Sequence, residues 1–228
     1  MGSQINSFLL TFLVFLPLIG GTITLCFKNN KPHFYHKMAA FWTGISLLLS
    51  FWLLIQHQTT LHAVGVEKSF AFIDRLSWIP NLRIQYQVGV DGLSLPMVVL
   101  TTLILFIAVF ASWNITEKAR MYFFLLLVLE TGVLGVFTSL DLFLFFIMWE
   151  LELIPMYFLI GLWGGPRRHY AAIKFILYTM FASAFMFVAF LAMYFLSDIG
   201  QRTFDLVYLL NHTDTIMASV PHDFKLFI

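Results

Sequence analysis

The sequence DLFLFFIMWELELIPMYFLIGLW, from Asp141 to Trp163, decides the fold. It is long and apolar enough to cross a bilayer as one helix, because about 20 residues at 1.5 Å each span the hydrocarbon core of about 30 Å. It also carries two carboxylates, Glu150 and Glu152, near its middle. A carboxylate at the bilayer centre costs at least about 2.5 kcal/mol, so these two groups indicate an ion or proton pathway.

The composition of the whole chain is that of an integral membrane protein. Of the 228 residues, 60% are hydrophobic and only 11% are charged, which is too apolar for the surface of a soluble globule. The net charge of +1 gives no indication of nucleic-acid binding. Cys26 is the only cysteine, so we expect no intrachain disulfide and no cysteine-ligated iron–sulfur cluster in this chain.

Hydropathy predicts an all-α, polytopic membrane domain that takes up residues 1–228. The first span has no Lys or Arg before it and is too long for the apolar part of a signal peptide, so we interpret it as a helix of the protein. Alternating polar and apolar residues at 83–88 predict a short hairpin. The six predicted spans are about 6–27, 38–56, 94–113, 119–138, 141–163 and 171–195, with a loop at 57–93 and a tail at 196–228.

Lysine and arginine gather in the short connections at one end of the predicted helices. Eight of the thirteen fall in or beside the connections between spans one and two, three and four, and five and six. The positive-inside rule then places these connections in the cytoplasm, matrix or stroma, and places both termini, the long loop and the tail on the opposite side. The eight residues are Lys28, Lys31, Lys37, Lys118, Arg120, Arg167, Arg168 and Lys174.

Three carboxylates are predicted at a similar depth in the membrane. Only two residues join the helices at 119–138 and 141–163, which makes the helices antiparallel neighbours. Glu130 and Glu150 each lie about 13 Å from this turn along their helices. Glu150 and Glu152 point about 200° apart, so they are expected to face different neighbours. The alternative interpretation of each glutamate is a neutral, hydrogen-bonded group in the helix core.

Pro155 and Lys174 complete the predicted site. Pro155 lacks the amide that would bond the carbonyl of Leu151, and a free carbonyl inside a membrane is tolerated where it lines a wet cavity. Lys174 is either part of the proton path or an anchor that extends toward the interface. It lies about 15 Å from the level of Glu150, too far for a direct ion pair.

Other polar residues have plainer interpretations. The motif VGVDGLSLP predicts a turn in which Asp91 caps the helix that Ser94 and Pro96 begin. His36 and His57 fall outside the predicted spans and lack the spacing of metal ligands. We therefore expect both histidines at loop surfaces, and we predict no metal site.

The run MWELELIPMYFLIGLWGGPRRHYAAIKFILYT, at 148–179, closely resembles the antiporter-like membrane subunits of respiratory complex I. It is most similar to the NADH dehydrogenase subunit 4 branch, NuoM, with its NdhD-like relatives in cyanobacteria and plastids. VGVDGLSLPMVVLT at 88–101 and GVFTSLDLFLFF at 135–146 match the same family in the same order. Together these matches run over roughly half of the chain.

The resemblance implies roles for individual residues. Glu150 occupies the position of the family's fifth-helix glutamate, which is essential to proton transfer. Lys174 matches the basic residue of the sixth helix, whose role is less central. Glu152 belongs to the WELEL pattern of NdhD-like members, while many relatives carry an apolar residue there. Glu130 remains a possible member of the path.

The resemblance also implies that this chain is the N-terminal portion of a longer fold. Family members have about fourteen helices with inverted repeats, and their fifth-helix glutamate works with a lysine of the seventh helix. That lysine is expected beyond Ile228, so we predict a companion polypeptide that carries the remaining helices.

The function implied is that of a proton-translocating membrane-arm subunit of an NADH:quinone oxidoreductase of the complex I type. The electron donor of the enzyme would be NAD(P)H or ferredoxin. FMN, iron–sulfur clusters and quinone are expected in partner subunits, because this chain shows no nucleotide loop and no cluster ligands. Its partners would be the adjacent antiporter-like subunits and the lipid bilayer. The predicted location is a bacterial plasma membrane, a thylakoid membrane or a mitochondrial inner membrane.

Two other functions remain open from the sequence. A subunit of an Mrp-type Na⁺/H⁺ antiporter would use the same carboxylate without a redox partner. A non-catalytic structural remnant would account for the absence of the seventh-helix lysine.

Overall fold

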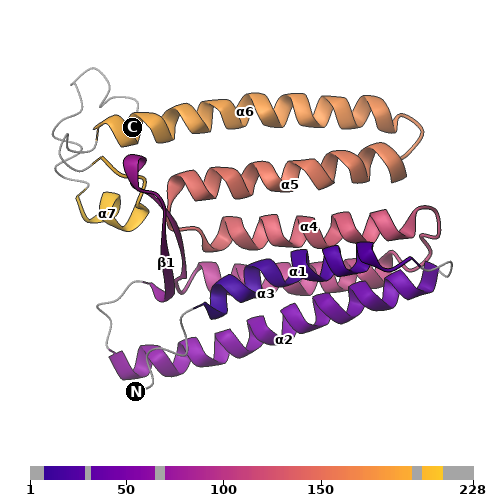
Figure 1. The fold of residues 1–228 in the computed structure, drawn as a ribbon, viewed down its shortest axis with the longest axis horizontal. Coiled ribbons are helices and arrows are strands. Elements are labelled where there is room, and N and C mark those ends of the chain that lie inside the picture. Colours follow the sequence, from indigo (N-terminus) through magenta and orange to yellow (C-terminus); the bar gives the residue numbers. More distant parts are fainter. Residues whose placement is uncertain (1–7, 29–31, 65–69, 197–201, 213–228) are drawn as a thin grey trace.

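Six long helices form the body of the described part of the chain, and they lie side by side (Figure 1). The computed structural model describes residues 8–28, 32–64, 70–196 and 202–212. All six helices are long and apolar enough to cross a membrane, which confirms the predicted fold. They are α1 (Leu9–Cys26), α2 (Pro32–Val64), α3 (Ser94–Ala111), α4 (Ala119–Thr138), α5 (Leu142–Trp163) and α6 (Arg168–Leu196).

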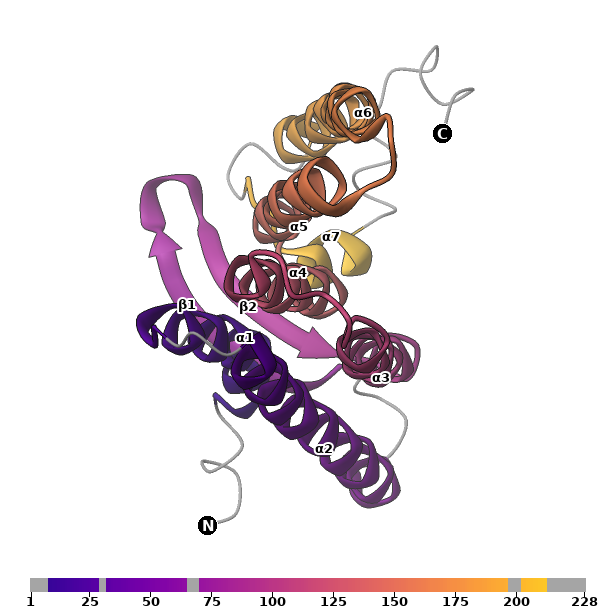
Figure 2. The same ribbon diagram turned by 90° about the vertical axis from the view of Figure 1, so that its right-hand side faces the viewer.

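Helix α4 is the centre of this arrangement. It packs against α5 on one side and against α1, α2 and α3 on the other, as the view along the helices shows (Figure 2). Helix α6 lies beyond α5 at the edge of the molecule and packs along it. The glutamates of α4 and α5 are therefore placed on helices that have neighbours on both sides.

Helix α2 is longer than the sequence predicted. The prediction gave a span at about 38–56, whereas the helix begins at Pro32 and continues to Val64. Hydropathy detects only the apolar centre, while proline at the first helical position and the absence of an interior breaker let the helix extend at both ends. The predicted loop at 57–93 is accordingly shorter than expected.

A β-hairpin crosses one end of the helices (Figure 1). Strands β1 (Ala71–Ile79) and β2 (Ile84–Val90) pair in antiparallel fashion, with the short helix η1 (Pro80–Leu82) between them. This confirms the hairpin predicted from the alternation at 83–88. We call this end of the molecule the hairpin end.

The turn before α3 also agrees with the prediction. The Asp91 carboxylate accepts hydrogen bonds from the amides of Leu93, at 3.1 Å, and Ser94, at 2.6 Å. Burial acts to raise the pKa of Asp91, but these hydrogen bonds outweigh it and lower the pKa below its usual value. Asp91 therefore caps α3 as a charged group.

The last residues of α1, α3 and α5 and the first residues of α2, α4 and α6 lie together at the opposite end (Figure 1). We call it the basic end, because the predicted cluster of lysines and arginines falls in and beside the connections between these helices. Lys31, one of the eight, lies outside the described residues.

Part of the predicted tail folds back over the hairpin end. Helix α7 (Leu206–Asn211) was not predicted. The segment before it pairs with the α4–α5 turn through the main chain, in a bridge between Asp141 and Asp205. Hydropathy does not detect so short a helix, because its position depends on contacts with distant residues.

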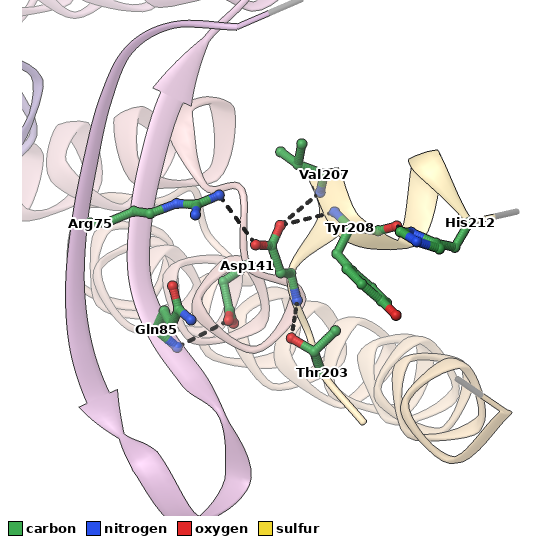
Figure 3. A network of polar contacts seen from close by, with 8 residues as sticks. Arg75, Gln85, Asp141, Thr203, Val207, Tyr208 and His212 are labelled. Carbon is green, nitrogen blue, oxygen red and sulfur yellow. Dashed lines mark hydrogen bonds and ion pairs between the residues drawn. The ribbon is translucent and has the colours of Figure 1, made fainter. Parts of the chain in front are cut away.

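A polar network joins the three segments at the hairpin end (Figure 3). The carboxylate of Asp141 accepts hydrogen bonds from the first amides of α5, at 2.9 and 3.1 Å, and from the amide of Gln85 in β2, at 3.1 Å. Asp205 caps α7 in the same way and forms an ion pair with Arg75 of β1 at 3.3 Å. The hairpin, the α4–α5 turn and α7 thus form one cap that fixes the start of α5.

Replacing Asp141 by alanine is expected to lower the free energy of unfolding by about 1–2 kcal/mol, because the helix loses its N-terminal cap and the amide of Gln85 loses its acceptor. Unfolding by dodecyl sulfate in mixed micelles measures the loss. Asp141→Ser keeps a capping oxygen and is the matched control, with a smaller expected loss. Equal stability of the alanine variant and the unmodified chain would show that the cap does not hold α5.

Burial, with the nearby charge of Asp205, raises the pKa of the Asp141 carboxyl despite its three amide donors. The folded chain therefore binds this proton more tightly than the unfolded chain. Consequently, the stability contributed by this group decreases as the pH rises through the raised pKa.

Candidate functional site

Glu150 lies on the side of α5 that faces α6. The ring of Phe146 stacks on Phe187 of α6 with 4.6 Å between centroids, and a Cβ at Gly161 would contact the Cβ of Ala172 at 3.6 Å. At 100° per residue, Glu150 falls between Phe146 and Gly161 on this face of α5. The carboxyl group is therefore placed between two helices and not toward α4.

The residue at the same level on α6 is Ser183. The two contacts above set an antiparallel register in which Glu150 and Ser183 lie opposite each other. Ser183 is buried, and its hydroxyl donates to the carbonyl of Met180 at 3.1 Å. The Oε1 atom of Glu150 is also buried and has no hydrogen-bond partner among the described residues. A buried oxygen without a partner costs free energy unless water or a proton satisfies it.

Pro155 lies one turn beyond Glu150 and is buried inside α5. The helix continues through it to Trp163. The carbonyl of Leu151 therefore has no amide at 155 to accept from. This carbonyl belongs to the residue that follows Glu150 in the chain.

Glu152 faces the opposite side, toward α4. A Cβ at Gly132 of α4 would lie 3.0 Å from the Cβ and 3.1 Å from the amide nitrogen of Glu152. The two helices therefore approach each other closely here, which glycine permits. The prediction that Glu150 and Glu152 face different neighbours is correct.

Glu130 faces α2 and is completely buried. Phe123 lies two turns earlier on the same face of α4, and its ring packs 4.6 Å from that of His36 on α2. The hydroxyl of Ser46 on α2 faces the Glu130 carboxyl, yet neither carboxyl oxygen has a hydrogen-bond partner in the described part of the chain. Glu130 thus belongs to the interior of the α1–α4 bundle.

The three glutamates have similar depths but do not form one cluster. Because Gly132 lies opposite Glu152, Glu130 is displaced by about 6 Å from Glu150 along the axis. The body of α4 separates the Glu130 side chain from the α5–α6 interface. Among the residues that the structure describes, no group of His, Cys, Asp and Glu could hold a metal ion.

Lys174 lies on the face of α6 that points away from α5. It is exposed, and its Nζ lies 5.9 Å from the ring centre of Tyr170 and 5.7 Å from that of Tyr178. These residues line a shallow, open hollow of about 630 Å³ at the basic end. Lys174 is nine residues from Ser183, or about 13 Å along the helix. It is therefore far from Glu150, as the sequence predicted.

The prediction that His36 and His57 lie at loop surfaces is wrong. Both belong to α2, and their exposed fractions are 0% and 6%. The error came from the underestimated length of α2, since both histidines lie just beyond the predicted span. Their spacing of three heptads from each other would have placed them on one helix face.

Comparison with known proteins identifies the family. Residues 68–135 match the model for the amino terminus of NADH-ubiquinone oxidoreductase chain 4, and residues 139–224 match the transmembrane model shared by NADH:quinone oxidoreductase and the Mrp antiporter. The chain is 39% identical over 203 residues to an NAD(P)H-quinone oxidoreductase chain 4 of Nostoc sp. strain PCC 7120, covering 88% of this chain and 36% of that relative. The chain thus spans about a third of the length of this relative.

Solved structures agree with this assignment. A chain of respiratory complex I from Thermus thermophilus superposes with a TM-score of 0.74 at 27% identity, over 89% of this chain and 39% of that one. A chain of the Mrp complex from a Dietzia species gives a TM-score of 0.66 at 16% identity, over 85% of this chain and 20% of that one, which shows the fold alone. The protein therefore belongs to the family of NAD(P)H-quinone oxidoreductase chain 4, of which it matches the N-terminal portion.

Proposed function

We propose that the chain is a proton-translocating part of the membrane arm of a complex I-type quinone oxidoreductase, with Glu150 as its proton-handling carboxyl. The observation that carries the proposal is the buried, unpartnered oxygen of Glu150 between α5 and α6, in a chain whose family is that of chain 4. An acid kept at such cost inside a membrane is a functional group by default.

The chemistry assigned to Glu150 is reversible proton binding. A positive charge brought close by a neighbouring helix favours the carboxylate over the acid. A change of charge nearby therefore makes Glu150 take up or release a proton. The carbonyl of Leu151, freed by Pro155, supplies an acceptor for the water that such transfer requires.

The remaining charged residues take secondary roles in this proposal. Lys174 provides a positive charge at the basic end, where it influences proton entry from a distance without forming an ion pair with Glu150. Glu152 is directed at α4 and contributes to packing more than to the path. The lysine that works directly with Glu150 is supplied by the rest of the subunit, in a further segment or a companion polypeptide.

The family supports a proposal for the partners and location of the chain. The chain lies in an energy-transducing membrane beside other antiporter-like subunits, with the basic end toward the cytoplasm, matrix or stroma and both termini on the other side. FMN, iron–sulfur clusters and quinone belong to partner subunits in this proposal. The donor of electrons, NAD(P)H or ferredoxin, is likewise bound elsewhere.

Isolation of the assembly tests this function against that of an antiporter. An affinity tag on this chain is expected to recover quinone-reductase subunits together with their flavin and iron–sulfur absorbance from membranes solubilised in mild detergent. Mass spectrometry and optical spectra identify them. Recovery of an antiporter complex without redox subunits would contradict the proposal and favour the Mrp alternative, with which the chain shares the fold.

A further inference from the structure

One face of α2 is polar along most of its length inside the bundle. Seven positions, spaced alternately by three and four residues, are buried, as expected for a single face of a packed helix. Five of the seven carry polar side chains, although polar groups are costly in a membrane interior. We call these seven positions the α2 seam: His36, Ala39, Thr43, Ser46, Ser50, Leu53 and His57.

The side chain of Glu130 is directed toward the middle of the α2 seam. Its carboxyl faces Ser46, and both of its oxygens are buried without a partner in the described residues. Ser46 itself donates to the carbonyl of Trp42 at 3.2 Å, so its hydroxyl oxygen still has a lone pair with which to accept. A carboxyl in this position is stable as the neutral acid, and its oxygens call for water as a partner.

The next polar group along the α2 seam is a pair of hydroxyls. Ser50 lies one turn from Ser46, about 6 Å along the axis, and its Oγ is 2.8 Å from Oγ1 of Thr102 on α3. Ser50 also contacts the carbonyl of Leu47 at 2.8 Å, and Thr102 contacts that of Val99 at 2.9 Å. The two hydroxyls have only two hydrogens for these three contacts. Either hydroxyl can therefore be the donor in the hydrogen bond between Ser50 and Thr102.

Such a pair is suited to relaying protons. In one arrangement Ser50 donates to Thr102, and in the other Thr102 donates to Ser50, while the remaining hydroxyl turns to its own carbonyl. A relay passes a proton by accepting on one side and donating on the other, which reverses the direction of the chain. Because each hydroxyl can also donate to its own carbonyl, the pair can rotate back to its first arrangement after a proton has passed.

The two ends of the α2 seam differ in what surrounds their histidines. At the basic end His36 bonds the carbonyl of Pro32 at 2.8 Å, and its ring packs between Trp113 and Phe123, at 5.3 and 4.6 Å. At the hairpin end His57 is buried with neither ring nitrogen partnered within the described residues. Nε2 of His36 is likewise buried without a partner among the described residues, so the two ends differ mainly in the aromatic rings that enclose His36.

We propose that the α2 seam is a hydrated proton path on which Glu130 exchanges its proton, through Ser46 and the Ser50–Thr102 pair, with His57 at the hairpin end. Leu53 lies between Ser50 and His57, which are about 10 Å apart along the helix. It packs in an apolar cluster with residues of α1 and α3, so the last step requires about three waters to enter this stretch. This path lies on the side of α4 opposite to Glu150. It is a second site of proton exchange in the chain, separate from the α5–α6 interface.

Each transfer step conserves the number of protons. Glu130 gives its proton to the neighbouring water or hydroxyl, which gives one of its own hydrogens to the next member. A proton that returns from the hairpin end restores the acid. No electron donor or further reactant is involved.

This inference deepens the proposed proton-transfer function by assigning a route to Glu130, and its test does not depend on pumping. The full chain is incorporated into phospholipid vesicles and transferred from H₂O to D₂O, while infrared spectroscopy follows the C=O stretch of its carboxylic acids. Glu130→Gln identifies the band of Glu130 by removing it, and Glu150→Gln identifies the band of Glu150. The measured quantity is the rate of isotope exchange at Glu130.

Two neighbouring threonines of α3 provide matched variants. Thr102→Val removes the partner of Ser50 and is expected to slow exchange at Glu130 by roughly tenfold, the effect of one lost hydrogen bond on a barrier. Thr101→Val makes the same change one residue away, where the hydroxyl donates to the carbonyl of Met97, at 2.8 Å, and is expected to leave the rate within about twofold. Thr102→Ser keeps the hydroxyl and restores the exchange rate.

Equal exchange rates in the Thr102→Val and Thr101→Val chains would overturn the path. A spectrum in which Glu130→Gln removes no carboxylic acid band would do the same, because Glu130 would then hold no proton to exchange. Neither result would affect the role proposed for Glu150, whose band and whose pumping defect are measured separately.

Discussion

Replacing Glu150 by glutamine in the intact assembly is expected to reduce proton pumping coupled to quinone reduction by at least roughly tenfold, since a positioned proton-transfer group contributes about a hundredfold or more. Glutamine keeps the shape and polarity of the side chain between α5 and α6 but cannot release a proton. Glu152, the other acid of α5, cannot replace it, because Glu152 lies against Gly132 on the other side of the helix. Acidification of inverted vesicles, followed with a quenching dye, measures the loss.

Two comparisons separate this effect from loss of assembly. Electron transfer from an artificial donor should remain measurable in the Glu150→Gln enzyme, because this reaction does not require the chain to move protons. Glu152→Gln is the matched control on the same helix and should retain most of the pumping. Equal defects in the two variants would show that both act through packing or assembly, and the assignment to Glu150 would be lost.

Replacing Gly132 by alanine is expected to lower the free energy of unfolding by about 1–3 kcal/mol. The new Cβ would meet the Cβ of Glu152 at 3.0 Å, its amide nitrogen at 3.1 Å and its Cα at 3.2 Å. Two of these atoms belong to the main chain, which cannot move without displacing α5. The shift would carry Glu150 with it, so pumping should fall together with stability.

Gly135 supplies the control for this experiment. A Cβ there would meet Cγ and Sδ of Met148 at 2.6 Å, but a methionine side chain is flexible and can repack. Gly135→Ala should therefore cost less than Gly132→Ala in dodecyl sulfate unfolding and should retain more pumping. A larger loss for Gly135→Ala would show that the approach at Gly132 does not control the spacing of α4 and α5.

The helices of this protein could be predicted because a bilayer imposes length and hydropathy on each span. The prediction for α4, 119–138, agrees with the structure residue for residue. The bounds of α2 could not be obtained in this way, since its ends are polar and are helical only because no residue interrupts them. Because the predicted span ended before His57, this histidine was wrongly expected in a loop.

Some features of the candidate site could likewise be predicted from the sequence, and others could not. The opposite directions of Glu150 and Glu152 follow from 100° per residue, and the structure bears them out. That Glu130 faces away from α5 could not be obtained from the sequence, because it depends on which neighbours surround α4. The bridge between Asp141 and Asp205 joins residues far apart in the chain, and a local sequence pattern cannot predict such a contact. Periodicity could have found the α2 seam, had the helix been assigned its full length.

The most direct test of the central claim is the number of protons moved per electron in vesicles that contain the intact assembly. Electron flow to quinone and proton uptake are recorded together, in the unmodified enzyme and in the Glu150→Gln enzyme. If Glu150 carries protons, the ratio falls in the variant even when the electron flow is matched by limiting the donor. An unchanged ratio of protons to electrons in the Glu150→Gln enzyme would contradict the role of Glu150 in proton translocation.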